Sequence, residues 1–570
     1  MNRDRSFDYV VVGAGSAGCV VAARLSQSAS VLLLEAGGPD AGIHHGVDIG
    51  ALVSDPSGII KSAWDATIGR PFQTEPQRGL GGRRIFINRG VVRGGCHAVN
   101  GMVYVRGHRR DFDAWAERGN EGWSYDEVLP AFMKSEAFDP SPLAYSPDDL
   151  RYHGTTGPLP VRPVPRPTPF AMAFIEATRE LGYRGGSPHW DFNGHTQEGG
   201  AGLFQVTVTP DGRRATTARA FLDAPDACPH LRVVLHATVV RIVIEHDRAV
   251  GVEYMVDGRR STARVDGEVV LCAGAFESPK LLMLSGIGPA GPLRTNGIAC
   301  RVELPGVGQN LQDHPMVVLF YETEGETGQS TFTAEAGLFV NTRDRSTASS
   351  PDLQFHALGK MPPLPDVMHE VARALPPRYF ALGPTVATPT SRGSLALRPG
   401  RPTAQPLIDP NYLQSEADWR TLERGIELAQ ELARARAVRA FGPRGSVFAI
   451  SDGRRVALPR AADVRAFIAS ALTTTWHPGG TCKMGRGEGA VVDPQLRVHG
   501  LDGLRVADAS IMPELPSGNI NAACIMVGEK CADLLRCESP PVAAVPAADP
   551  PPPPIPEILA AIINARRGPA

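Results

Sequence analysis

A glycine-rich turn between an apolar strand and a helix constrains the fold of this chain more than any other feature. In "FDYVVVGAGSAGCVVAARLSQSASVLLLEAG" an apolar run leads into Gly13-x-Gly15-x-x-Gly18, a helical run over residues 16–27 and a second apolar run ending at Glu35. Gly13 permits the tight turn, Gly15 lets backbone N–H groups approach a pyrophosphate, and Gly18 lets the helix pack on the sheet. This spacing predicts a βαβ dinucleotide-binding unit.

Glu35 stands where such a unit carries its acidic residue, 22 positions after Gly13. A carboxylate at this position accepts hydrogen bonds from the adenosine ribose hydroxyls and disfavours the 2′-phosphate of NADP. The motif does not separate NAD from FAD. A packing role for the glycines, without any nucleotide, also stays open at this point.

Composition limits the class of partner. The chain has 570 residues, 42% of them hydrophobic, which is enough for more than one core and leads us to expect two domains. Its 58 basic and 60 acidic residues leave a net charge of −2, so no nucleic acid or anionic membrane is expected as a partner. A small neutral ligand fits this charge better.

Cysteine spacing and the apolar runs bear on the compartment. The nine cysteines are scattered, and none stands in a CxxC or Cys/His spacing typical of zinc, so we expect reduced thiols and no metal site. The first apolar run begins so close to Met1 that a secretory leader has no room before it. No run of about 18 apolar residues is present. Together these features predict a cytoplasmic protein without an integral membrane segment.

Six segments, in a fixed order along the chain, carry a further signal. They are the glycine motif with "LEAGG", "RGGCHAVNGMVYVRG" (93–107), "GAFESPKLLMLSGIGP" (274–289), "LPGVGQNLQDH" (304–314), "WHPGGTCKMG" (476–485) and "GLRVADASIMPELPSGNINAACIMVGEK" (503–530). With these segments the sequence resembles the glucose-methanol-choline (GMC) oxidoreductase family, and within it the choline dehydrogenase-like branch. The resemblance runs from about residue 7 to residue 536.

The resemblance implies an α/β fold, in which a Rossmann-like FAD-binding domain carries an inserted α+β substrate domain built on an antiparallel sheet. We expect residues 1–159, 226–315 and 465–537 to form the FAD-binding domain. Residues 160–225 and 316–464 are expected to form the substrate domain, and residues 538–570 a proline-rich tail.

The tail combines a stiff segment with an amphipathic one. Prolines at 550–554 favour a polyproline II spacer. Five apolar side chains beyond it share one helical face: Ile555, Ile558, Leu559, Ile562 and Ile563. We hypothesise that this short helix docks into a groove of the same chain, a sister subunit or another protein. A frayed tail is the competing interpretation, because so short a helix is marginal alone.

The resemblance also implies FAD rather than NAD, and carries cofactor contacts over to matching positions. These are Gly13, Gly15, Ser16, Ala17, Gly18, Glu35, Ala36, Arg89, Gly90, Val92, Gly94, Gly95, Asn100, Gly101, Met102, Val103, Val239, Ala273, Gly274, Trp476, Asp508, Ala509, Asn519, Ile520 and Asn521. Relatives usually show two serines after Gly94-Gly95, where this chain has Cys96-His97. Members that bond FAD covalently do so through a histidine whose position is Val99 here. We therefore expect noncovalent FAD and keep a bond to His97 as a hypothesis.

His477 and Asn521 match the catalytic histidine of the family and its partner, which is His or Asn in relatives. Pro478 biases His477 toward an extended backbone. A histidine with a pKa of about 6.5 can take a hydroxyl proton only as the alkoxide develops, with donors nearby to stabilise the charge. The amide of Asn521 would supply such a donor. A packed core histidine is the competing interpretation of the dipeptide alone.

The implied activity is FAD-dependent oxidation of a small-molecule alcohol to an aldehyde or ketone, with oxygen, a quinone or another compound as electron acceptor. His314 and Cys482 are expected to be structural. Two rival functions stay open on the same scaffold: a lyase that keeps FAD without using its redox chemistry, and a non-catalytic flavoprotein that acts through its tail. The sequence does not identify the alcohol.

Overall fold

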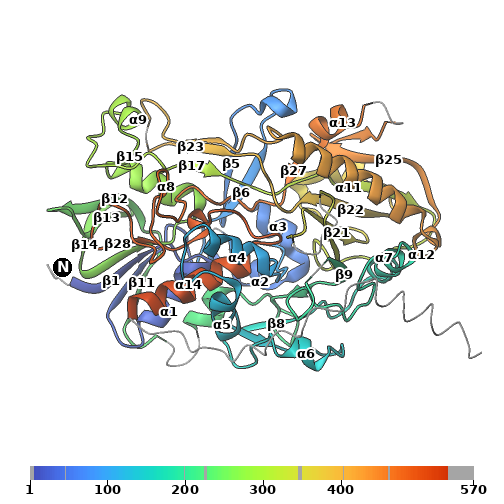
Figure 1. Cartoon of the computed structure of the whole chain (residues 1–570), viewed down its shortest axis with the longest axis horizontal. Helices are drawn as coiled ribbons and strands as arrows, with labels where there is room; N and C mark the ends of the chain where they lie inside the picture. Colours follow the sequence, from blue (N-terminus) through green and yellow to red (C-terminus); the bar gives the residue numbers. More distant parts are fainter. Residues whose placement is uncertain are drawn as a thin grey trace, which may run out of the picture.

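Two large sheets organise the chain. The structure is a computed structural model that describes residues 6–44, 46–197, 199–223, 228–343, 349–401, 403–459 and 463–536. One sheet has seven strands and the other nine; the first lies on the left of Figure 1 and the second on the right. The predicted tail helix of residues 555–563 lies outside the described residues.

The seven-stranded sheet is mixed and draws on three distant stretches of sequence. Its strands, in spatial order, are β11 (Leu231–Val234), β2 (Val31–Leu34), β1 (Ser6–Val12), β14 (Arg259–Leu271), β13 (Arg248–Val256) and β12 (Thr238–Glu245). β28 (Leu504–Val506) also pairs with β14. β1 runs parallel to both β2 and β14, whereas β12, β13 and β14 pair antiparallel. The continuous apolar runs of β1 and β2 are typical of parallel strands covered on both faces.

Two helices pack together beside the parallel strands. They are α1 (Ser16–Leu25), which follows the glycine turn, and α14 (Asn521–Arg536). Gly528 permits their close approach, because a Cβ there would lie 2.8 Å from the carbonyl oxygen of Ala17. α1 is two residues shorter than the predicted run, and α14 occupies residues 521–536.

The nine-stranded sheet is antiparallel. Its strands are β26 (Arg454–Ala457), β25 (Pro443–Ser451), β19 (Leu319–Thr323), β22 (Tyr379–Val386), β21 (Leu353–Leu358), β20 (Ala336–Val340) and β9 (Gly200–Leu203), with β18 (Pro315–Met316) and β27 (Thr473–Thr474) off this path. All residues of β21 and β22 are buried. The boundaries of the two predicted domains stay a prediction.

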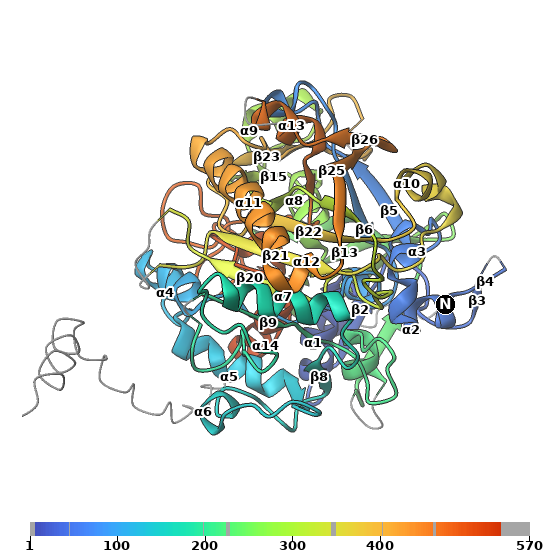
Figure 2. The same cartoon turned by 90° about the vertical axis from the view of Figure 1, so that its right-hand side faces the viewer.

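Helices cover one face of this second sheet. α7 (Pro169–Glu180) contacts β20 and β21, and α11 (Glu416–Arg434) contacts β22; both cross in front of the strands in Figure 2. Leu353 of β21 packs toward α11, where a Cβ on Gly425 would lie 3.0 Å from it. Because side chains alternate along a strand, Gln354 and His356 point to the opposite face.

Smaller elements complete the surroundings of the two sheets. They are the hairpin β5 (Gly69–Gln73) and β6 (Phe86–Gly90), the short helix η3 (Gly95–Ala98), the helices α4 (Arg109–Glu117), α5 (Tyr125–Ser135) and α8 (Gly274–Leu284), and the sheet of β7 (Glu136–Phe138), β8 (Leu159–Pro163) and β10 (Gln205–Val206). Among the residues described, no helix is both long and apolar enough to cross a membrane.

Candidate active site and cofactor cavity

A cavity of about 650 Å³ opens where β1, β2 and β14 end. In parallel sheets this edge is where nucleotides bind. Fourteen of the residues predicted to contact the cofactor line it: Gly13, Gly15, Ser16, Ala17, Glu35, Ala36, Arg89, Gly90, Gly95, Val239, Ala273, Gly274, Asp508 and Ala509. The other predicted contacts lie outside its lining: Gly18, Val92, Gly94, Asn100, Gly101, Met102, Val103, Trp476, Asn519, Ile520 and Asn521.

Hydrogen bonds hold two of the carboxylates that line the cavity, Glu35 and Asp508. Glu35 accepts hydrogen bonds from the N–H groups of Ala14 and Gly37, both at 2.7 Å. Burial raises the pKa of Glu35, and these two bonds oppose the shift. Asp508 accepts from Gly274 N at 2.8 Å and from Ser278 Oγ at 2.6 Å. Each carboxylate therefore has a fixed position in the wall.

The cavity fits an extended dinucleotide such as FAD. The helix α1 begins at its wall, so the N–H groups of its first turn can bind an anion placed in the cavity. Two stretches of backbone approach each other so closely there that a side chain would not fit between them. A Cβ on Gly95 would lie 2.7 Å from Gly15 Cα. Thr238 and Val239 supply the rim on the side of β12. The cavity thus offers a nucleotide a site for its phosphates, a carboxylate for its ribose and a suitable volume.

Gly18 sets the distance between α1 and the glycine turn. A Cβ at this position would lie 1.9 Å from the carbonyl oxygen of Gly13. We expect Gly18→Ala to abolish flavin binding, because the turn must move to admit the methyl group. The check is the flavin absorbance of the purified protein. Gly291→Ala, where a Cβ would meet nothing within 4 Å, is the control and should keep its flavin. Normal flavin content in Gly18→Ala would contradict the assignment.

His477 is half-buried and lies in a polar cluster beside this cavity. Its backbone N–H donates to Asp313 Oδ1 at 2.8 Å. The preceding residue, Trp476, has φ +60°, in the left-handed region that a bulky side chain rarely adopts. Arg89, which lines the cavity, donates to the carbonyl oxygen of Trp476 at 2.8 Å. These bonds fix the backbone that presents the imidazole.

Hydrogen bonds determine which imidazole nitrogen of His477 carries the proton. Asn519 Nδ2 lies 3.4 Å from His477 Nε2 and can only donate, so Nε2 is the acceptor. The proton of His477 then sits on Nδ1, which lies 2.9 Å from Thr475 Oγ1 and 3.0 Å from His314 Nδ1. Thr475 Oγ1 donates to the carbonyl oxygen of His314 at 3.2 Å and is thus free to accept. His477 therefore turns a lone pair on Nε2 toward Asn519.

The surroundings keep His477 neutral. Burial, with smaller contributions from His314, His356 and Arg89, lowers its pKa well below the ordinary 6.5. Burial likewise lowers the pKa of His314 to about 3 and that of His356 to about 4. A neutral imidazole can accept a proton on its unprotonated ring nitrogen.

The two asparagines of "GNIN" differ in position. The sequence led us to expect Asn521 beside His477, whereas the structure places Asn519 there. Asn521 is the first residue of α14, and its Oδ1 accepts a hydrogen bond from Ser16 Oγ at 2.7 Å. It therefore joins α14 to the start of α1. Asn519 precedes the helix, and Gln354 Nε2 donates to its Oδ1 at 3.1 Å.

Several neighbours of His477 were not among the predicted site residues. Gln354 and His356 come from β21, and no local motif marks them. His314 was expected to be structural, and the structure places its ring perpendicular to that of His477, with centroids 5.2 Å apart. The "QDHP" segment was the only available signal for it. Cavity residues Arg70 and Gln405 were also missed, because they come from segments distant in sequence.

His97 makes hydrogen bonds through both ring nitrogens. Nδ1 accepts from Thr217 N at 3.1 Å, and Nε2 lies 3.0 Å from Thr207 Oγ1. Its side chain is fully buried and does not line the cavity. Cys482 is also fully buried, and burial raises the pKa of its thiol well above 9. Neither side chain is presented to a ligand in the cavity.

A dinucleotide cavity on a mixed sheet, with a neutral histidine and an amide beside it, defines a cofactor-dependent enzyme of the Rossmann-like α/β class. The chain belongs to the GMC oxidoreductase family. The N-terminal model of that family matches residues 7–316 and the C-terminal model residues 389–528. The fold class and the cofactor, FAD, predicted from the sequence are thereby confirmed.

Individual relatives agree with this assignment. The chain is 39% identical over 565 residues to an oxygen-dependent choline dehydrogenase of Ectopseudomonas mendocina, with 94% of each protein covered. It is 38% identical to the protein of the same name from Pseudomonas aeruginosa, covering 94% of this chain and 96% of that protein.

Solved structures show the same fold. Pyridoxine 4-oxidase from Mesorbium loti superposes with a TM-score of 0.78 at 31% identity, covering 92% of this chain and 98% of that one. Formate oxidase superposes with a TM-score of 0.80 at 24% identity, covering 94% and 99%, and shows the fold alone. The protein is thus an FAD-dependent oxidoreductase acting on CH–OH groups, and the comparisons give the lyase and non-catalytic interpretations no support.

Proposed function

We propose that His477 removes the hydroxyl proton of the alcohol and that Asn519 holds the alcohol oxygen. The observation that supports this most directly is the unprotonated Nε2 of His477, which lies 3.4 Å from the amide of Asn519, both side chains being half-buried. A base and a donor that converge on one point can bind a hydroxyl group between them. The sequence predicts Asn521 for the second role, and the hydrogen bond of its side chain with Ser16 of α1 favours Asn519 instead.

The surrounding residues orient this pair. Gln354 holds the carbonyl end of Asn519, so the NH₂ group is directed to His477. Thr475 and His314 hold His477 Nδ1, which leaves Nε2 as the only ring nitrogen able to accept a proton. FAD bound in the cavity supplies the acceptor for the hydride of the carbinol carbon. The amide donor stabilises negative charge on the oxygen as the proton leaves.

FAD is proposed to be noncovalent and to contact the residues predicted from the sequence. The hydrogen bonds of His97 to Thr207 and Thr217, and its position outside the cavity lining, support this. Acid precipitation provides the test. Flavin colour should remain in the supernatant, whereas colour that stays with the pellet would contradict a noncovalent cofactor.

A panel of alcohols tests the proposed reaction. Choline and pyridoxine belong in the panel because relatives are named for them; benzyl alcohol and a primary alkanol extend it. At least one alcohol should bleach the flavin absorbance in the absence of oxygen. Reoxidation of the reduced protein with oxygen and with a quinone then identifies the electron acceptor. A full panel that leaves the flavin oxidised would contradict the proposal.

The pH dependence of flavin reduction follows from the lowered pKa of His477. The base must be unprotonated to act, and burial keeps it so at pH values where an ordinary histidine is charged. Flavin reduction by the alcohol should therefore keep its full rate as the pH falls through 6.5, with the acid limb well below that value. Stopped-flow reduction between about pH 5 and 9 measures this limb. A midpoint at 6.5 or above would contradict the assignment of the base.

A cytoplasmic location is part of the proposal. The eight cysteines among the described residues are all free, as in proteins of reducing compartments. Fractionation of cells that express the full chain tests this. Recovery of the protein outside the cytoplasmic fraction would contradict it.

A further inference from the structure

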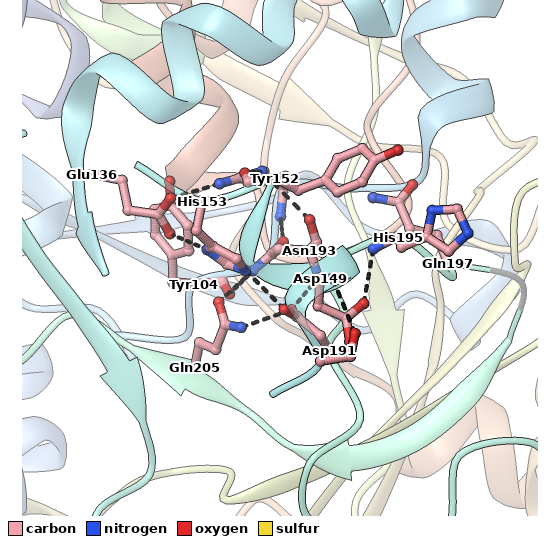
Figure 3. Close-up of polar contacts among 12 residues, drawn as sticks. Tyr104, Glu136, Asp149, Tyr152, His153, Asp191, Asn193, His195, Gln197 and Gln205 are labelled. Carbon is pink, nitrogen blue, oxygen red and sulfur yellow. Dashed lines mark hydrogen bonds and ion pairs between the residues drawn. The ribbon is translucent and has the colours of Figure 1, made fainter. Parts of the chain in front are cut away.

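A histidine outside the active site is buried between two carboxylates. His153 Nδ1 lies 2.9 Å from Glu136 Oε1, and His153 Nε2 lies 2.8 Å from Asp191 Oδ2. All three side chains are fully buried. The imidazole stacks on Phe138, with ring centroids 3.8 Å apart and an interplanar angle of 18°. Figure 3 shows the ring held between the two acids.

The geometry requires both ring nitrogens to donate. A neutral imidazole would turn one lone pair toward a carboxylate oxygen at hydrogen-bond distance, which is repulsive. An imidazolium donates to both acids, and with Arg106, whose Nη2 lies 2.7 Å from Glu136 Oε2, it balances their two negative charges. The acids raise the pKa of His153 to about 9 against the effect of burial. The nearby titratable groups Tyr104 and Tyr145 have pKa values raised by burial, so they stay neutral over the same range.

The second acid of this cluster organises two amide side chains. Asp191 Oδ1 accepts from Gln205 Nε2 at 2.7 Å and from Asn193 N at 2.9 Å. Asn193 Nδ2 in turn donates to Gln205 Oε1 at 2.8 Å. Through these bonds the orientation of Asn193 and Gln205 depends on the position of Asp191, which His153 holds from the other side (Figure 3).

The side-chain amide of Asn193 and the backbone of Gln205 and Thr207 bind the chain at the predicted flavin loop and just after it. Asn193 Nδ2 donates to Tyr104 O at 3.0 Å, and Asn193 Oδ1 accepts from Arg106 N at 2.8 Å. Tyr104 N donates to Gln205 O at 2.8 Å, and Thr207 N donates to Met102 O at 2.9 Å. The backbone from Met102 to Arg106 is therefore hydrogen-bonded through both N–H and C=O groups.

We propose that His153, as an imidazolium shared by Glu136 and Asp191, is a positioning residue for the flavin: it holds the chain at Tyr104–Arg106 and thereby the loop 100–103, and loss of its proton at alkaline pH releases the flavin. The proposal rests on the proposed contact of residues 100–103 with FAD. It assigns to a buried ionic cluster the role of keeping the cofactor bound over the neutral pH range.

The direction of the pH effect follows from the raised pKa. A histidine charged more readily in the folded protein than in the unfolded chain stabilises the fold fully below about pH 6.5. This contribution decreases as the pH rises and is lost through pH 9, where His153 gives up its proton. Deprotonation leaves two buried carboxylates opposite Arg106 alone, and the excess negative charge pushes Glu136 and Asp191 apart.

The first test measures flavin release from the wild-type holoenzyme. The rate of release, followed by the rise of free-flavin fluorescence, should increase about tenfold per pH unit from about pH 7.5 and level off near the titration of His153. Hydrogen exchange of the peptide that covers residues 98–107 should rise over the same range. A release rate that is flat from about pH 7.5 to 10 would overturn the proposal.

Variants separate the charge of His153 from its shape. His153→Gln, which carries no charge, should release flavin rapidly and without pH dependence. His153→Lys keeps a charge to higher pH, so its flavin should stay bound near pH 9, above the range in which the wild type releases it. His195→Gln is the matched control, because His195 lies on the same segment as Asp191 with an exposed side chain, and it should behave as wild type.

Two outcomes would contradict the inference separately from the proposed function. If His153→Gln and wild type release flavin with the same pH profile, His153 does not position the loop. If exchange of residues 98–107 rises while the flavin stays bound, the loop does not retain the cofactor. The proposed catalytic function fails by a different result, namely the absence of flavin reduction by any alcohol at pH 7, where His153 is charged in the wild type.

Discussion

His477→Gln will slow the reduction of bound flavin by the alcohol about 10²- to 10⁴-fold, the usual effect of removing a general base. A glutamine amide can accept a hydrogen bond from the substrate hydroxyl but cannot take its proton at neutral pH. Anaerobic stopped-flow absorbance measures the step directly, because the flavin itself reports the hydride transfer. Flavin content should stay at the wild-type level, since His477 does not line the nucleotide cavity.

The control for this experiment is a histidine far from the cluster. His369 is exposed, and its Nδ1 lies 3.1 Å from the carbonyl oxygen of Asp366. His369→Gln should therefore reduce its flavin at the wild-type rate. A His477→Gln enzyme that keeps a rate within a few-fold of wild type would show that another group accepts the proton. His314 and His356 would then be the next candidates, because both lie in the same buried cluster.

The nucleotide-binding half of the site could be predicted because its chemistry is local. Gly13, Gly15 and Gly18 lie within six residues of one another, and their spacing alone determines the turn. Glu35 follows at the end of the next strand. A contact within such a βαβ unit needs no knowledge of the rest of the fold.

The substrate half could not be predicted in the same way. Gln354 and His356 reach the cluster because β21 pairs with β20 and β22 in the middle of the nine-stranded sheet. A contact between residues that lie far apart in the sequence, such as that of Gln354 with Asn519, leaves no spacing to recognise. The buried ion cluster could not be predicted for the same reason. Glu136, His153 and Asp191 come from three segments that meet only in the folded chain.

The asparagine partner of His477 shows a further limit of prediction from the sequence. The motif "GNIN" contains two asparagines two residues apart, and the resemblance alone selected the second. The structure begins α14 at Asn521, so this residue belongs to the helix and faces α1, while Asn519 stays in the preceding loop. The contact of the first residue of α14 with α1, which the motif does not reveal, therefore decides which amide reaches the base.

Asn519→Ala and Asn521→Ala will lose different properties. In Asn519→Ala the rate of flavin reduction should fall about 10²- to 10³-fold, as when one donor to a developing oxyanion is removed. Its flavin content should be normal, because Asn519 bonds His477 and Gln354 rather than the cavity wall. Asn521→Ala removes the partner of Ser16, so it should weaken flavin retention about two- to tenfold, as expected for one hydrogen bond.

Measuring both properties in both variants makes the comparison decisive. The rate at saturating alcohol reports the chemical step, and flavin release during dilution reports retention of the cofactor. If Asn521→Ala loses the rate and Asn519→Ala loses the flavin, the two roles are exchanged and the original expectation from the sequence is restored. If both variants lose only flavin, neither amide stabilises the alkoxide. His356, a neutral imidazole of the same cluster that can donate through a ring N–H, would then be the next candidate donor.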